Sequence, residues 1–120
     1  TNDLSQYLFA ADRMHPELGA LSNPWQPALL RNVASAVTHA TALGIPVGVC
    51  GVSAANPLLS IVFAGVGVDS VSAAPSAVDA VSEALRAVSL EQAHEAASIA
   101  LAATTAQDAE SGVRALFEAS

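Results

Sequence analysis

Two groups of residues in this sequence have side chains that could carry chemistry. Asn2 and Asp3 open the first group, which continues with Asp12 and Arg13, and Cys50 stands alone as the second. Asp3 could ligate a hard cation such as Mg²⁺, which favours carboxylate oxygen and substrate phosphate. Arg13 could bind a phosphate or carboxylate through two parallel N–H groups. Both also have ordinary structural interpretations: a helix cap or Asx turn for Asp3, and a surface ion pair of Arg13 with Asp12.

Cys50 has two interpretations as well. A lone cysteine at the end of a buried strand is usually a small core residue. Exposed beyond the carboxyl end of a parallel strand, a thiol could instead donate or accept a proton. Gly48 and Gly51 lie on either side and would let a ligand approach the backbone, which favours the functional interpretation. The histidines show no metal-ligand spacing; they are His15, His39 and His94.

The elements that must position these residues follow from the glycines, prolines and asparagines that divide the chain. Residues 45–50 form a short Val-rich run typical of a parallel strand buried on both faces. Residues 58–64 predict a short helix and residues 70–73 a second strand, so this stretch predicts a βαβ unit. Before it, an apolar stripe at helical spacing predicts a helix that begins near Pro27 and ends before Gly44.

The rest of the chain is predicted to be helical. Residues 4–12 predict a short first helix, followed by a loop that ends near Asn23. Cap patterns at Ser76, Ser89 and Thr105 predict the starts of three further helices. The predicted fold class is α/β. A parallel sheet of two or three strands has unprotected edges, so the elements fit the last third of an eight-stranded (β/α)₈ barrel better than a free-standing fold.

Composition limits the possible functions. The net charge is -7 and the only basic residues are four arginines, which disfavours a nucleic-acid partner. One cysteine excludes an intrachain disulfide. The longest apolar stretch, residues 58–68, is far shorter than the roughly 20 residues needed to cross a bilayer. We therefore expect a cytoplasmic protein that does not act at a membrane. The polar opening at Thr1 leads us to expect a fragment of a longer chain.

The motifs, taken together and in order, resemble one family. Residues 1–7 read TNDLSQY and residues 11–13 read ADR, similar to a segment of enzyme I of the bacterial sugar phosphotransferase system. Residues 23–30, 49–51 and 65–72 resemble its later segments, so the similarity covers essentially the whole chain. Pyruvate phosphate dikinase and phosphoenolpyruvate synthase share much of the TND and Cys-Gly pattern. Tyr7, the ADR form and the short tail favour enzyme I.

The resemblance implies a fold and an activity. The fold would be the phosphoenolpyruvate-binding (β/α)₈ barrel, of which residues 1–120 would be the C-terminal part. The whole enzyme would move phosphoryl from phosphoenolpyruvate to a histidine on its N-terminal domain and on to a phosphocarrier protein. By family position, Asp3 would ligate Mg²⁺, Asn2 and Arg13 would hold the substrate phosphate, and Cys50 would deliver a proton to make pyruvate. The resemblance also implies a cytoplasmic homodimer.

One residue departs from the family pattern. The family has Glu directly after Cys-Gly, and Val52 stands there in this sequence. The family's other arginines, its second metal-binding carboxylate and its phosphorylated histidine would precede Thr1, so we do not expect the chain to catalyse the reaction alone. The alternatives are the equivalent piece of a dikinase or synthase, and a truncated paralogue without catalysis, which Val52 favours.

Overall fold

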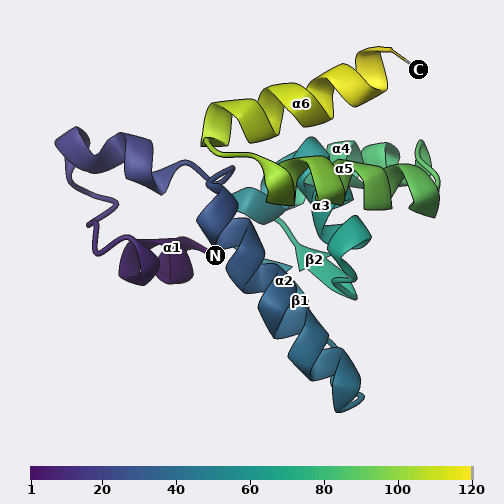
Figure 1. Cartoon of the computed structure of the whole chain (residues 1–120), viewed down its shortest axis with the longest axis horizontal. Coiled ribbons are helices and arrows are strands. Elements are labelled where there is room, and N and C mark those ends of the chain that lie inside the picture. Colours follow the sequence, from purple (N-terminus) through teal and green to yellow (C-terminus); the bar gives the residue numbers. More distant parts are fainter. Residues whose placement is uncertain (120) are drawn as a thin grey trace.

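Six α-helices and a two-stranded parallel sheet form residues 1–119, the part of the chain that the computed structural model describes (Figure 1). Two short 3₁₀ turns, η1 and η2, complete the chain. In sequence order the elements are α1 (Asn2–Leu8), η1 (Pro16–Ser22), α2 (Pro27–Ala42), β1 (Gly48–Cys50), η2 (Val52–Ala55), α3 (Pro57–Val66), β2 (Ser70–Ser72), α4 (Pro75–Arg86), α5 (Leu90–Ala102) and α6 (Ala106–Glu118).

The sheet confirms the predicted βαβ unit. Strands β1 and β2 run parallel, with Val49 opposite Val71 and Cys50 opposite Ser72, and α3 makes the crossover. Just before β1, the Val47 N–H donates to Oδ2 of Asp69 at 2.7 Å, and the Asp69 N–H donates to the Val47 carbonyl at 2.9 Å. The starts of the two strands are therefore held together by one backbone hydrogen bond and one from the Asp69 side chain.

The strands are shorter and less buried than the sequence predicts. β1 begins at Gly48 rather than at residue 45, and Ile45 is 54% exposed. Successive side chains of a strand point to opposite faces, and only the face that carries Val49 is buried under helices. The prediction of burial on both faces is therefore wrong for this chain. The two strands form an open sheet, which is consistent with part of a barrel but does not close one.

The core is built around α3. Its apolar residues are buried on several sides, which suits a central helix of high hydrophobicity. Helix α5 approaches so closely that a Cβ built on Gly65 would lie 1.9 Å from the Ala93 carbonyl oxygen. Glycine and alanine allow this approach because they add little volume between the two backbones. The buried residues of α5 are accordingly all alanines: Ala93, Ala96, Ala97 and Ala100.

Helix starts agree with the predicted caps in most places. Pro27 begins α2, and Ser89 and Gln92 form the complete capping box of α5. The Thr105 hydroxyl accepts from the Asp108 N–H at the start of α6. The cap predicted at Ser76 is wrong, because α4 starts one residue earlier, at a proline that suits the first helical position.

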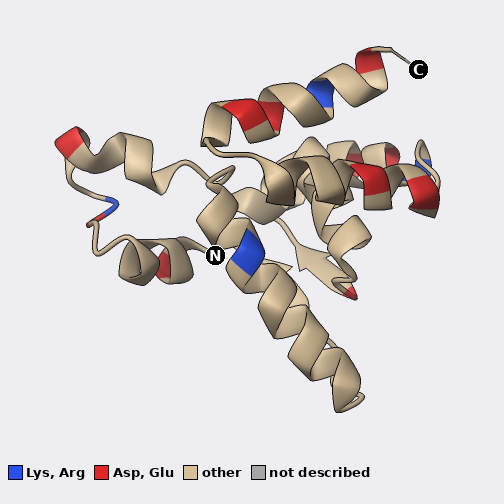
Figure 2. Cartoon of the chain, viewed as in Figure 1, with Lys and Arg blue, Asp and Glu red and all other residues tan. Residues whose placement is uncertain are grey.

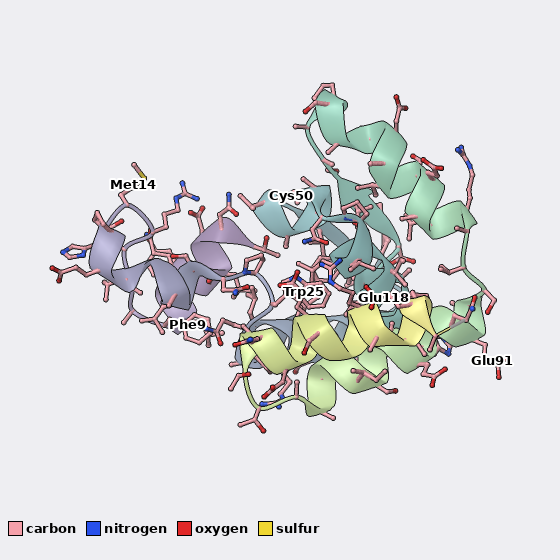
Figure 3. All side chains as sticks on the ribbon, turned by 90° about the horizontal axis from the view of Figure 1, so that it is seen from above. Phe9, Met14, Trp25, Cys50, Glu91 and Glu118 are labelled. Carbon is pink, nitrogen blue, oxygen red and sulfur yellow. The ribbon has the colours of Figure 1, made fainter. Side chains whose placement is uncertain are left out.

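Helix α1 and η1 form an arm beside the α2 helix (Figure 1). The predicted first helix extends to residue 12, but α1 ends at Leu8, and Ala10 then adopts a left-handed conformation with φ of 50°. Met14 in this arm points away from the protein, whereas Trp25 lies among the packed helices and is 2% exposed (Figure 3). Over residues 1–119, we find no helix with the length and apolar character that a bilayer crossing requires.

Candidate functional site

The first turn of the chain and the turn after β1 meet at the candidate site. The backbone nitrogen of Thr1 donates to the Cys50 carbonyl at 2.9 Å, and its hydroxyl donates to the same oxygen at 3.0 Å. The Val52 N–H donates to Oδ1 of Asn2 at 3.0 Å. These contacts join two of the predicted functional segments, although about fifty residues separate them in sequence.

Gly51 lies where these two segments meet, and only glycine suits this position. Gly51 has φ of 100°, and a Cβ at this position would lie 2.9 Å from both Oδ1 of Asn2 and Oγ1 of Thr1. A side chain here would be strained and would also push the two segments apart. The glycine after Cys50 therefore serves close packing between backbone and side chains of this same chain.

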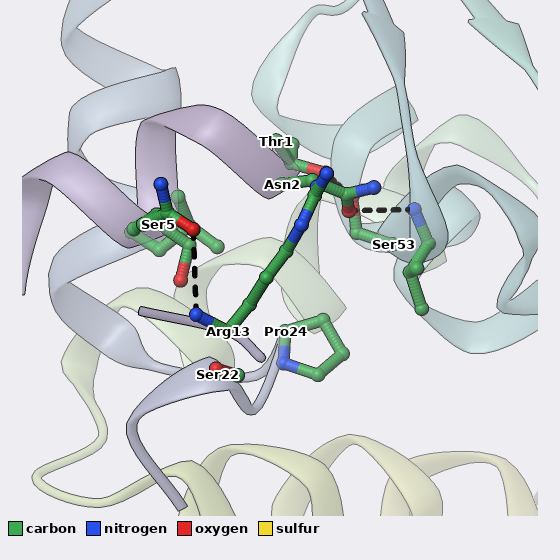
Figure 4. Close-up of a pocket in the computed structure, with 10 residues that line it drawn as sticks. Thr1, Asn2, Ser5, Arg13, Ser22, Pro24 and Ser53 are labelled. Atoms are coloured by element: carbon green, nitrogen blue, oxygen red, sulfur yellow. Dashed lines mark hydrogen bonds between the residues drawn. The ribbon is translucent and has the colours of Figure 1, made fainter. Parts of the chain in front are cut away.

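A cleft of about 270 Å³ opens beside this junction (Figure 4). Its walls carry hydroxyl, amide and guanidinium groups, together with a few apolar side chains. No carboxylate is among the lining side chains, although acidic residues stand on the arm beside the cleft as well as on α4, α5 and α6 (Figure 2). The lining residues are Thr1, Asn2, Ser5, Gln6, Arg13, Ser22, Pro24, Leu29, Val52 and Ser53.

Arg13 is the cation of this cleft. Its backbone N–H donates to Oε1 of Gln6 at 3.3 Å, which places the loop over α1. Its guanidinium lies 3.8 Å from a carboxylate oxygen of Asp3, and the two side chains are 46% and 81% exposed. A pair this long and exposed is weak, so the guanidinium stays available to an anion. The ion pair of Arg13 with Asp12 is not formed; Asp12 instead accepts from the Met14 N–H at 2.9 Å.

Asp3 lies in the first turn of α1 but does not line the cleft. The helix cap is Thr1, so Asp3 is not the cap residue that its structural interpretation supposes. Over residues 1–119, no three His, Cys, Asp or Glu side chains gather closely enough to hold a metal ion by themselves. Asp3 is therefore a single exposed carboxylate at the edge of the site.

Cys50 ends β1, as predicted, and is an exposed free cysteine. The interpretation as a core thiol is wrong, because only Val49 of this strand is buried. The Cys50 side chain does not line the cleft, but its neighbour Val52 does and is 65% exposed. The structure thus brings Asn2 and Arg13 into one cleft, with Cys50 and Asp3 at its margins.

Several polar residues of the site were not predicted from sequence. Thr1 holds the Cys50 carbonyl, and Ser53 lies 1% exposed against the Thr1 hydroxyl. Ser5 is 8% exposed, and among residues 1–119 its hydroxyl has no hydrogen-bond partner. The spacing of Ser5 four residues after Thr1 could have placed both on one face of a helix. The role of Ser53 depends on a long-range contact that no local pattern announces.

Known proteins match the part of the chain that contains the cleft and the Cys50 turn. Residues 1–90 match the family model described as "PEP-utilising enzyme, PEP-binding domain". A phosphoenolpyruvate-protein phosphotransferase of Streptomyces coelicolor is 44% identical over 117 residues, 98% of this chain and 21% of the relative. A multiphosphoryl transfer protein of Rhodobacter capsulatus is 41% identical over 108 residues, 90% of this chain and 13% of the relative.

A third relative is similar at lower identity. A phosphoenolpyruvate-protein phosphotransferase of Bacillus sp. is 32% identical over 117 residues, 98% of this chain and 20% of the relative. The chain thus spans between 13% and 21% of the length of these curated relatives. The matched residues 1–90 hold the cleft, the Cys50 turn and the parallel sheet. This chain therefore belongs to the family of PEP-utilising enzymes, in the part that forms their PEP-binding domain.

Proposed function

We propose that this chain is the C-terminal, phosphoenolpyruvate-binding part of a phosphoenolpyruvate-protein phosphotransferase. The whole protein would transfer phosphoryl from phosphoenolpyruvate to a histidine on its N-terminal domain, and from there to a phosphocarrier protein for sugar uptake. The names of the relatives support this, as does family membership. The observation that carries the proposal is that Asn2 and Arg13 line one cleft beside the Cys50 turn.

The cleft is suited to an anionic substrate. In a chain of net charge -7, its walls contain a guanidinium and no carboxylate. Because Oδ1 of Asn2 already accepts from the Val52 N–H, the amide nitrogen of Asn2 is the group left to donate. Arg13 and Asn2 would therefore both present N–H donors to the phosphate of phosphoenolpyruvate, an arrangement that neutralises and orients it.

Asp3 fits a role as one ligand of Mg²⁺. Its carboxylate is 81% exposed and only loosely paired with Arg13. Magnesium is commonly bound through one or two carboxylates together with substrate phosphate and water, so a single carboxylate at the edge of a phosphate site is a suitable donor. When bound, Mg²⁺ would supply positive charge next to the substrate phosphate.

Cys50 would act as the general acid. Transfer of phosphoryl breaks the bond between phosphorus and the enol oxygen and forms a bond to the histidine nitrogen, which leaves the enolate of pyruvate. The Cys50 thiol would give its proton to the methylene carbon of that enolate, forming pyruvate and a thiolate that water reprotonates. The exposed position of Cys50 at the carboxyl end of β1 supports this role, because barrel enzymes place reactive groups there.

The larger assembly is part of the same proposal. The open parallel sheet would be continued into a (β/α)₈ barrel by strands from the remainder of the longer protein. The homodimer that the family resemblance implies is proposed for the longer protein as well. A cytoplasmic location follows from the proposed phosphocarrier partner.

The test is made in the full-length protein, with pyruvate release and transfer to the phosphocarrier protein measured together. Cys50→Ala is expected to abolish pyruvate release while phosphoenolpyruvate still binds, because the cleft keeps Asn2 and Arg13. Undiminished pyruvate release by this variant would remove Cys50 from the reaction. Transfer to the phosphocarrier protein distinguishes the proposed activity from that of a dikinase or synthase. The isolated 120-residue chain is expected to release no pyruvate.

A truncated paralogue without catalysis is the second candidate, and Val52 is the observation that favours it. An apolar side chain, 65% exposed, faces the cleft where the family has Glu. If Val52 has cost the protein its activity, Val52→Glu will release pyruvate and the unchanged protein will not. Pyruvate release by the unchanged protein at the rate of Val52→Glu would exclude this candidate.

A further inference from the structure

The Thr1 hydroxyl links the two ends of the turn that carries Cys50. It donates to the Cys50 carbonyl at 3.0 Å and contacts the Ser53 hydroxyl within hydrogen-bonding distance. Ser53 is 1% exposed, so its hydroxyl is removed from water. A buried hydroxyl that loses its partner carries the full cost of its desolvation, so this contact stabilises the turn.

The donor and acceptor in each of these two hydrogen bonds follow from the number of hydroxyl protons. Each hydroxyl has one proton, and a carbonyl oxygen can only accept. Since Thr1 donates to the Cys50 carbonyl, Ser53 must donate to Thr1. The chain of bonds therefore runs from Ser53 through Thr1 to Cys50. It leaves Thr1 with no proton to give to an anion in the cleft.

The turn needs such an anchor. Gly51 has φ of 100° and no side chain, so the backbone between Cys50 and Val52 has little intrinsic restraint. The Cys50 side chain is exposed and is not packed in the core. The backbone of the turn therefore sets where the Cα–Cβ bond of Cys50 points. The backbone of the turn is held at Cys50 by Thr1 and at Val52 by Asn2, and the Ser53 side chain bonds to the Thr1 hydroxyl.

We infer that Thr1 and Ser53 are positioning residues for Cys50: their coupled hydroxyls fix the turn that aims the thiol at the substrate carbon. This inference rests on the proposed function, in which Cys50 is the proton donor. Both residues line the cleft, but the Thr1 proton is already donated to the Cys50 carbonyl and Ser53 is 1% exposed, so in this inference the two hydroxyls act through that carbonyl and not on the substrate. A proton donor displaced by a fraction of an ångström loses rate without any loss of substrate binding.

The test compares Thr1→Val, Thr1→Ser and the matched control Thr38→Val in the full-length protein. Thr38 also donates to a carbonyl, that of Ala34 at 3.0 Å, but on the exposed face of α2. Thr1→Val is expected to lower kcat for pyruvate release by roughly 3- to 10-fold, the effect of one hydrogen bond, with KM for phosphoenolpyruvate unchanged. Thr1→Ser is expected to restore kcat, and Thr38→Val to leave it at the wild-type value.

A second variant tests the coupling. Ser53→Ala is expected to lower kcat in the same range, and the double variant Thr1→Val with Ser53→Ala to fall less than the product of the two single effects. In the isolated chain, the rate of Cys50 alkylation by iodoacetamide is expected to rise in Thr1→Val and not in Thr38→Val. Thermal midpoints of all variants separate this effect from global unfolding.

The outcomes separate the inference from the proposed function. If Cys50→Ala abolishes pyruvate release and Thr1→Val does not change kcat, the inference fails and the function stands. A raised KM with unchanged kcat would make Thr1 a substrate ligand and overturn the inference. If Cys50→Ala has full activity, the proposed role of Cys50 as proton donor fails and its positioning for catalysis fails with it; the alkylation rates still decide whether Thr1 anchors the turn.

Discussion

The side-chain oxygen of Asn2 accepts a hydrogen bond of 3.0 Å from the backbone N–H of Val52. This contact ties the start of α1 to the turn after β1, and so links a proposed substrate ligand to the segment that carries Cys50. It also orients the Asn2 amide, because its oxygen is occupied and its nitrogen is left to donate. One side chain thus contributes to both the shape and the donor pattern of the cleft.

Replacing Asn2 is expected to show this structural role. Asn2→Ala removes the acceptor for the Val52 N–H and should lower the free energy of unfolding by about 1 kcal/mol. Asn2→Asp keeps an acceptor and should lose less. Urea denaturation of the isolated chain measures both. Asn32→Ala is the control, because Asn32 donates to the Ala28 carbonyl within α2, on its exposed surface. An equal loss of stability in Asn32→Ala would contradict the prediction.

The close contact between α3 and α5 predicts that Gly65 cannot be replaced. In Gly65→Ala the new methyl group would lie 1.9 Å from the Ala93 carbonyl oxygen, a backbone atom that cannot turn aside. Overpacking of this kind costs about 1–3 kcal/mol or more, so we expect a lower melting temperature. Gly19→Ala has nothing within 4 Å of the added carbon and is the matched control. Equal melting temperatures would show that the helices move apart freely.

Two buried serines are expected to respond in opposite directions. The Ser5 hydroxyl has no hydrogen-bond partner in the described part of the chain, so Ser5→Ala removes an unsatisfied polar group and should leave stability unchanged or raise it by about 1 kcal/mol. The Ser60 hydroxyl donates to the Ala54 carbonyl at 3.2 Å, so Ser60→Ala should lower stability by about 1 kcal/mol. Chemical denaturation of both variants gives the comparison. A destabilising Ser5→Ala would mean that its hydroxyl has a partner in solution.

Arg31 is expected to matter more for stability than its exposure suggests. Its guanidinium donates to the carbonyls of Leu101 at 2.9 Å and Ala103 at 2.8 Å, at the end of α5. Hydrogen bonds from a charged group to otherwise unpaired carbonyls at a helix end stabilise it, so Arg31→Met should cost about 1–2 kcal/mol. Arg114 forms only a surface pair with Glu110, and Arg114→Met should cost less than about 0.5 kcal/mol. Thermal unfolding of both variants tests the difference.

Local patterns predicted the helices and the sheet well where the deciding interactions are local. Pro27, the Ser89 capping box and the Thr105 cap all begin helices as predicted, because each bonds or fits within a few residues of itself. The cap at Ser76 was wrong because the neighbouring Pro75 takes the first helical position. The length of the first helix was also overestimated, since nothing in its pattern indicated the left-handed residue Ala10.

The sequence by itself determined the order of the elements, the parallel βαβ unit and the position of Cys50 at the end of a strand, because hydrophobic spacing and turn residues act locally. Only the tertiary structure decided which polar groups share a cleft. It brought Asn2 and Arg13 together, left Cys50 and Asp3 at the margin, and paired Thr1 with Ser53. The physical reason is that hydrogen bonds between segments about fifty residues apart depend on how the chain packs, and no spacing along the sequence encodes their distances.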